Sequence, residues 1–167
     1  MHTLYTLGYT GLKQARLLEI IQTLGALVVD TRFSSRSRAV QWTGSGLRKL
    51  LGESYLHLPS LGNINYKGDG PIKINKPAEG VPQVVSLLAQ QPVILLCVCG
   101  DVHTCHRKVV AEMVRQACSC EVVHLLGGEI SPLTTPSLNI GEQISPLSGS
   151  PLTLTSKPLP LYQRRMF

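Results

Sequence analysis

The stretch PVILLCVCGDVHTCHR, residues 92–107, decides how this chain is expected to fold. Its first half is the most hydrophobic run of the sequence, which is typical of a strand buried on both faces of a parallel sheet. Its second half turns polar and leads into a helical pattern over about residues 104–117. A strand that passes through a short loop into a helix is the repeating unit of an α/β protein.

The same alternation extends over about residues 3–126. Apolar runs predict further strands at residues 3–8, 26–32, 55–59 and 121–126. Apolar residues at helical spacing predict helices over residues 11–25, with Gly25 as the C-cap, from about residue 43, and over residues 79–91. The predicted fold class is α/β: a three-layer, Rossmann-like or flavodoxin-like, mostly parallel sheet with helices on both faces.

Length and composition fit one domain followed by a tail. The chain has 167 residues, of which 43% are hydrophobic, enough for one core. We assign residues 1–129 to a single α/β domain. Residues 130–167 hold six of the eleven prolines and sustain no helical or strand period. They are expected to form an extended or disordered tail, which either has no specific role or binds a partner.

The net charge indicates which classes of partner the protein binds, and the cysteine content indicates its cellular compartment. The net charge of +6 favours small anionic ligands, nucleotides or nucleic acid. No apolar run has the length of a membrane span, and the first residues lack a signal-peptide pattern, so we expect no membrane partner. The odd number of cysteines indicates free thiols and a cytoplasmic location. No nucleotide-fold fingerprint is present, and no cofactor is predicted.

Polar residues follow the predicted strands at the points where those strands end. Because parallel strands all end at the same edge of a sheet, we expect these residues to converge on a ligand site there. The candidate catalytic residues are Asp30, His57, Cys97 and Cys105. The candidate substrate-binding residues are Gly8, Thr10, Arg32, Arg38, His106 and Arg107, with the arginines holding an anion.

Each of these assignments has a simpler structural alternative. Asp30 and Arg32 lie two residues apart on a strand end, so they are also placed to form a structural ion pair. Arg38, together with Arg36, is equally compatible with a solvated loop. A lone histidine such as His57 is more often structural than catalytic.

The cysteines allow two kinds of chemistry. Cys105 lies at a predicted helix start, where a thiol has a lowered pKa and becomes nucleophilic. Zinc is the competing interpretation, because Cys97, Cys99, Cys105 and the two nearby histidines are all of ligand type. Their spacing matches no common structural-zinc pattern, so no metal is predicted. A third alternative is that Cys97 packs in the strand as a small apolar residue.

The motifs, taken in order, resemble the domain-of-unknown-function 488 family. They are GYT at residues 8–10, Asp-x-Arg at 30–32 followed by Ser-Arg at 37–38, YLHLPSLGN at 55–63, LLC at 95–97 and CHR at 105–107. The resemblance covers about residues 3–126 and implies an α/β fold with its site at these motifs. Two positions depart from the family pattern: Cys99 stands where an acid is usual, and Ser35 where proline is usual.

These observations together favour one function and leave one alternative. The favoured function is that of an enzyme acting on a small anionic or nucleotide-like substrate at the carboxyl edge of the sheet. The alternative is a basic module that binds nucleic acid or acts as an adaptor. The low aromatic content, 5%, counts against a stacking surface for single strands.

Overall fold

The computed structural model describes residues 1–68 and 70–129, and over these it alternates strands with helices, as the sequence predicts. The strands are β1 (Leu4–Gly8), β2 (Leu27–Asp30), β3 (Tyr55–His57), β4 (Val93–Cys97) and β5 (Val122–Leu125). The helices are α1 (Gln14–Leu24), α2 (Gly44–Leu51), α3 (Pro77–Leu88) and α4 (His106–Cys118). The predicted tail, residues 130–167, lies outside the described residues. In the described part of the chain, no helix has both the length and the apolar character needed to cross a membrane.

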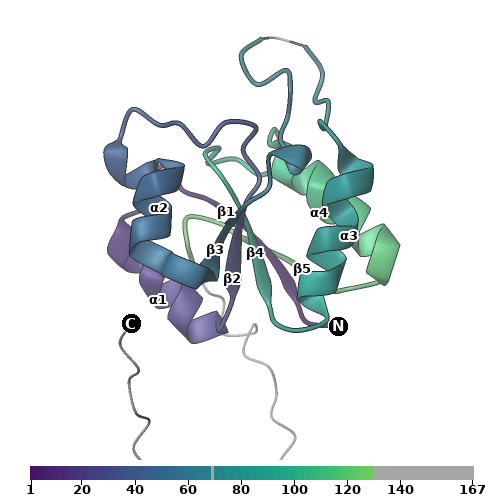
Figure 1. Ribbon diagram of the computed structural model, residues 1–167, viewed down its shortest axis with the longest axis horizontal. Helices are drawn as coiled ribbons and strands as arrows, with labels where there is room; N and C mark the ends of the chain where they lie inside the picture. Colours follow the sequence, from purple (N-terminus) through teal and green to yellow (C-terminus); the bar gives the residue numbers. More distant parts are fainter. Residues whose placement is uncertain (69, 130–167) are drawn as a thin grey trace, which may run out of the picture. The chain divides into compact units, whose positions relative to one another are not determined.

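The five strands form one sheet in which every pairing is parallel (Figure 1). The strand order is β3-β2-β4-β1-β5, so β4 is the central strand, and all five of its residues are buried. It pairs with β1 on one side and with β2 on the other. The run of apolar residues that stands out in the sequence is therefore buried on both edges and on both faces.

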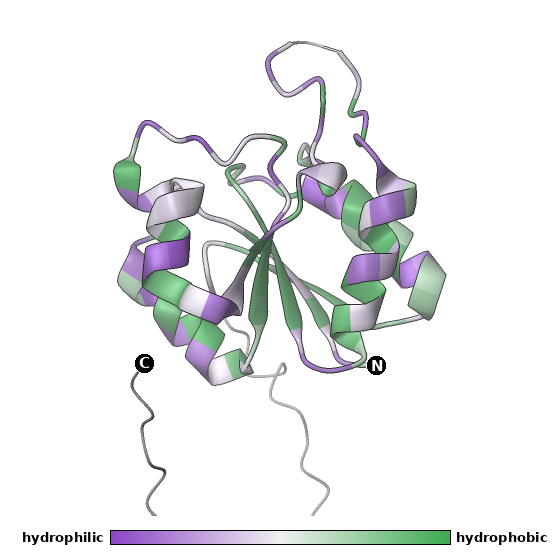
Figure 2. Cartoon of the chain, viewed as in Figure 1, coloured by the Kyte–Doolittle hydropathy of each residue, from purple (hydrophilic) through white to green (hydrophobic). Residues whose placement is uncertain are grey.

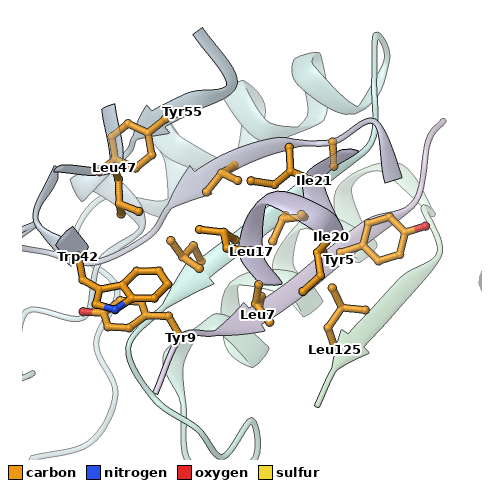
Figure 3. Close-up of a cluster of buried hydrophobic side chains, with 14 residues drawn as sticks. Tyr5, Leu7, Tyr9, Leu17, Ile20, Ile21, Trp42, Leu47, Tyr55 and Leu125 are labelled. Carbon is orange, nitrogen blue, oxygen red and sulfur yellow. The ribbon is translucent and has the colours of Figure 1, made fainter. Parts of the chain in front are cut away.

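Alternation along the strands divides the core into two layers of side chains. Ile94 and Leu96 pack toward α1 and α2, in the cluster drawn in Figure 3, whereas Val93 and Leu95 pack toward α3 and α4. Figure 2 shows the resulting pattern: the central strands are mostly green, while the helices carry green and purple residues. The predicted three-layer α/β fold is confirmed.

The order of the strands creates a switch point beside β4. From β1 and β2 the chain moves toward one edge of the sheet through α1 and α2, on one face. From β3 and β4 it moves toward the other edge through α3 and α4, on the opposite face. Changing direction and face together keeps all crossovers of one hand, as the rule for parallel strands requires. The chain therefore leaves the neighbouring strands β2 and β4 in opposite directions. Open parallel sheets bind ligands at such a point.

The helix ends follow local signals in the sequence. Gly25 caps α1 in the left-handed conformation, with φ of 58°, as predicted. Helix α3 begins at Pro77, where the missing N–H of proline costs no helical hydrogen bond. Helix α4 begins at His106, slightly later than predicted, because the carboxylate of Asp101 accepts the backbone N–H of His103 and holds a turn before it.

Gly8, the last residue of β1, lets the loop after β4 cross close above it. A Cβ atom on Gly8 would lie 1.8 Å from the carbonyl oxygen of Cys99. In the same loop, a Cβ atom on Gly100 would meet only Thr10, at 3.9 Å. The position of Cys99 therefore depends on the absence of a side chain at residue 8.

This close approach predicts unequal effects for two glycine substitutions. Gly8→Ala should lower the free energy of unfolding by about 2–3 kcal/mol, because neither backbone segment has room to move away. Gly100→Ala, the matched control, should stay within about 0.5 kcal/mol of the wild type. Chemical denaturation measures both values. Equal stability of the two variants would contradict the described packing of the loop on β1.

Candidate functional site

Asp30 and Arg32 form a buried ion pair at the end of β2. Nε of Arg32 donates to Oδ1 of Asp30 at 2.8 Å, and Nη2 donates to Oδ2 at 2.5 Å. Oδ2 also accepts the hydroxyl of Tyr55 at 2.7 Å. Burial, and then the charge of Asp30, raise the pKa of Tyr55 above its usual value. These contacts correspond to the structural ion pair that the sequence leaves open.

Arg32 is engaged on its other side as well. Its Nη1 donates to the hydroxyl of Tyr9 at 2.8 Å and to the carbonyl of Trp42 at 2.9 Å. The rings of Tyr9 and Trp42 stack with their centroids 4.5 Å apart (Figure 3). Burial tends to lower the pKa of Arg32, but the hydrogen bond to Asp30 and its charge outweigh it, so the pKa is raised. Four of the five N–H donors of this guanidinium are thus committed within the protein.

Three thiols gather where β4 leads toward α4. Cys97 ends β4, Cys105 is the N-cap of α4, and Cys99 lies in the loop between them. Their sulfur atoms all lie within 4.8 Å of one another, and those of Cys97 and Cys99 are 3.8 Å apart. All three are free thiols, two of them buried and Cys99 partly exposed.

His106 joins this cluster from the first position of α4. Its Nε2 lies 2.9 Å from the carbonyl oxygen of Thr31. A carbonyl oxygen can only accept, so Nε2 carries the hydrogen and Nδ1 is the nitrogen that faces the thiols. Nδ1 lies 3.7 Å from the sulfur of Cys97. We call Cys97, Cys99, Cys105 and His106 the thiol–histidine cluster.

Hydrogen bonds among the thiols separate their pKa values. Cys105 accepts from Cys97 and then from Cys99, which lowers the pKa of Cys105. The same bond to Cys105 raises the pKa of Cys97 to about 12, and bonds to Cys105 and Cys97 raise that of Cys99. Burial tends to lower the pKa of His106, but its hydrogen bond to Cys105 helps to raise it. These hydrogen bonds therefore favour the thiolate form at Cys105 over the thiolate form at Cys97 or Cys99.

Arg107 holds the loop in place from below. Its Nη1 donates to the carbonyl of Cys99 at 2.6 Å, and its Nη2 to the carbonyl of Gly100 at 3.2 Å. The side chain is 1% exposed. Although the sequence suggests an anion ligand, the structure places Arg107 beneath the loop, where it fixes the position of Cys99.

Three other predicted site residues are also occupied with the backbone. The N–H of Tyr9, next to Gly8, donates to the carbonyl of Cys97. The N–H and hydroxyl of Thr10 both donate to the carbonyl of Val98. Nε2 of His57 lies 2.8 Å from the carbonyl of Arg32. Gly8, Thr10 and His57 are not among the residues that line the neighbouring cavity, and their roles in substrate binding or catalysis stay predictions.

A cavity of about 480 Å³ opens above the thiol–histidine cluster. Of the predicted site residues, it brings together Arg32, Arg38, Cys97 and His106. The loop after β2 forms one wall, the long loop between β3 and α3 contributes a second, and the connection from β4 to α4 contributes the third. The loop between β3 and α3 reaches the cavity through Asn63, Tyr66 and Ile72. A second hollow, of about 370 Å³, adjoins it and is lined by Arg36, Arg38 and Lys67 among others.

Several residues of the site were not assigned from the sequence. Phe33 and Tyr66 line the cavity with their ring centroids 5.9 Å apart, and Thr31 orients His106. Tyr66 lies in a loop whose length and composition were the only signal. No signal in the sequence links Thr31 to His106, because their contact depends on β2 and β4 being neighbours.

Comparison with known proteins adds no relative: no family model, no curated protein and no solved structure matches this chain.

The buried ion pair predicts a large cost for removing its negative member. Asp30→Asn should lower the free energy of unfolding by about 3–5 kcal/mol, because the charge of Arg32 is left buried without a counter-charge. Tyr55→Phe removes one hydrogen bond to the carboxylate and should cost about 2 kcal/mol. The exposed control Glu53→Gln should change it by less than about 0.5 kcal/mol. Thermal or chemical denaturation tests this order, and an Asp30→Asn variant as stable as the control would contradict it.

Proposed function

We propose that the protein is an enzyme that acts on a small anionic, nucleotide-like substrate bound in the cavity above the thiol–histidine cluster. The observation that carries the proposal is the arrangement of three kinds of group around one cavity. Arginines line one wall, aromatic rings stand beside them, and thiols with an imidazole lie at the base. A cavity of about 480 Å³ is within the usual range for small-molecule sites.

The arginine wall supports binding of an anion. Arg36 and Arg38 are exposed, and within the described residues no carboxylate pairs with either guanidinium. No aspartate or glutamate of the described chain lines this cavity or the adjoining hollow, which adds Lys67. Guanidinium groups match the oxygens of phosphates and carboxylates in pairs. These two arginines differ from Arg32 and Arg107, which are buried and donate to groups of the protein.

The aromatic pair supports a flat substrate rather than a bare anion. Phe33 and Tyr66 are 39% and 50% exposed, and their rings are tilted by 38° to each other. Large exposed rings beside a cavity offer stacking surfaces to a base. A nucleotide combines a ring with phosphates and so fits both walls.

The groups at the base of the cavity support an enzyme rather than a simple binding protein. Cys97, Cys99 and His106 all reach the cavity, and a cysteine next to an imidazole is a common source of nucleophiles. Membership of the domain-of-unknown-function 488 family, suggested by the motifs, is part of the same proposal. So is a cytoplasmic location, which is supported by five cysteines that are all free.

Nucleic-acid binding is the second candidate, and one observation favours it. Arg36, Arg38 and Lys67 surround the exposed ring of Tyr66, an arrangement that also suits a single strand. The enzyme and the nucleic-acid-binding module require ligands of different length. A mononucleotide fills only the cavity, whereas a single strand would extend beyond it. Oligonucleotides therefore belong in the binding test.

Binding of nucleotides is expected to depend on the arginine wall. Calorimetric titration with nucleoside mono-, di- and triphosphates, pyrophosphate and short oligonucleotides should identify a mononucleotide as sufficient. The double variant Arg36→Ala/Arg38→Ala should weaken its binding by about tenfold per arginine, as expected for lost charged hydrogen bonds. The control Lys13→Ala/Lys49→Ala removes the same charge away from the cavity and should bind within about twofold of the wild type.

Three outcomes would contradict this account. Equal losses in both double variants would show a general effect of charge. Tight binding of oligonucleotides alone would favour the nucleic-acid candidate. Incubation of a bound nucleotide with stoichiometric protein, followed by mass spectrometry, should reveal a product, and binding without any product would make the protein a binding module.

The aromatic wall predicts a difference between two classes of ligand. Tyr66→Ala should weaken nucleotide binding by about tenfold, since base stacking contributes roughly 1–3 kcal/mol. It should leave pyrophosphate binding unchanged, because pyrophosphate has no ring. Tyr66→Phe keeps the ring and should bind both ligands as the wild type does. A Tyr66→Ala variant that loses both ligands equally would contradict a stacking role.

A further inference from the structure

The thiol–histidine cluster has the composition of a metal site. Three thiols and one imidazole nitrogen are ligands that Zn²⁺ binds in a closed, four-coordinate site. Catalysis by a thiol requires one cysteine and one base, which leaves the other two cysteines of the cluster unexplained. A bound metal ion would use all four side chains.

Two distances within the cluster match those between ligands of a tetrahedral ion. With Zn–S bonds of about 2.3 Å and a Zn–N bond of about 2.0–2.1 Å, two sulfurs are about 3.8 Å apart, and a sulfur and a nitrogen about 3.6 Å. The sulfurs of Cys97 and Cys99 are 3.8 Å apart, and Nδ1 of His106 lies 3.7 Å from the sulfur of Cys97. The sulfur of Cys105 lies within 4.8 Å of both other sulfurs. Closing the tetrahedron requires the side chains of Cys105 and His106 to rotate when the ion binds.

The surroundings of His106 are those of a metal ligand. Metal-binding histidines usually donate their second ring N–H to a carbonyl or carboxylate, which fixes the ring and its tautomer. Here Nε2 donates to the carbonyl of Thr31 at 2.9 Å. That bond leaves the lone pair of Nδ1 directed at the cysteines.

The backbone holds the ligands before any ion arrives. Cys97 belongs to the central strand, whereas Cys105 and His106 form the start of a helix, and all three are at least nine-tenths buried. Cys99 is held through its carbonyl by Arg107. Three thiolates around Zn²⁺ leave one net negative charge, which the amino end of α4 and the buried guanidinium of Arg107 oppose.

We infer that Cys97, Cys99, Cys105 and His106 bind one Zn²⁺ ion. The spacing of these residues gives no sign of it, because two ligands come from a helix start and one from a strand end instead of from paired knuckles. Cys99 is the partly exposed ligand, and it lies against the cavity. If the proposed function holds, Cys99 occupies the corner of the tetrahedron that faces the substrate, and its metal-bound thiolate takes the place of a free thiol as the nucleophile. The presence of the ion does not rest on that function.

Metal analysis of the purified full-length protein provides the first test. After dialysis to remove loosely bound metal, we expect about one zinc per chain. Cys105→Ser should lose the metal, while the matched control Cys118→Ser/Cys120→Ser should retain it, because those two thiols lie at the far end of α4 or beyond it. A control that loses the zinc would place the ion elsewhere and overturn the inference.

Cobalt substitution tests the ligands without relying on a variant that folds. Wild-type protein stripped of zinc by a chelator and given Co²⁺ should develop thiolate-to-cobalt charge transfer in the near ultraviolet and the visible bands of a tetrahedral ion. Added Zn²⁺ should abolish both. Cys99→Ser should still bind Co²⁺, with a weaker charge-transfer band because one thiolate is missing.

A folded wild-type protein with less than about 0.1 zinc per chain and no cobalt charge transfer would overturn the inference. Nucleotide binding is measured separately, so the two proposals fail independently. Loss of the zinc site with retained nucleotide binding would leave the substrate proposal intact, and an intact zinc site without nucleotide binding would refute only the latter.

Discussion

The burial of β4 is the constraint on which the other features of this structure depend. The strand is hydrogen-bonded on both edges and covered on both faces, so the chain can leave it only at its carboxyl end. There the chain must turn over the neighbouring strand β1 before it reaches α4, and the turn fits because Gly8 has no side chain. The same turn carries Cys99 back toward Cys97 and brings the start of α4 beside the end of β4. The thiol–histidine cluster is thus a consequence of how a fully buried strand is connected to its helix.

The arginines of the site fall into two groups, one buried and one exposed. Arg32 and Arg107 are buried, and they donate hydrogen bonds to Asp30, to Tyr9 and to carbonyl groups of the chain. They fix the loops that surround the cavity. Arg36 and Arg38 are exposed at its wall, and no carboxylate of the described residues pairs with them. Arg32 anchors the start of the loop after β2, through Asp30 and Trp42, and Arg107 anchors the loop between β4 and α4, through Cys99 and Gly100.

The fold was largely predictable from the sequence, because hydrophobic runs and helical spacing depend on neighbours along the chain. The central place of the strand at residues 93–97 followed from its apolar composition, and the cap at Gly25 from a local signal. The convergence of Arg38, Cys97 and His106 followed from the rule that parallel strands end at one edge. The hydrogen bonds of Arg32 and Arg107 could not be predicted from the sequence. The charge of an arginine does not reveal whether its guanidinium already donates to protein groups, such as the hydroxyl of Tyr9 or the carbonyl of Cys99. The close approach of the three thiols and His106 could not be predicted for a similar reason. Sequence spacing identifies metal ligands that lie on one loop, but not ligands that the fold brings together from a strand end and a helix start.

The central claim is that the thiol–histidine cluster and the arginine wall belong to one site. Phosphorus relaxation of a nucleotide bound to the cobalt-substituted protein tests it directly, because a paramagnetic ion speeds relaxation only of nuclei close to it. The account predicts strong broadening of the phosphorus signals with Co²⁺ and none with Zn²⁺. A nucleotide that binds the cobalt-loaded protein without any paramagnetic broadening would contradict it.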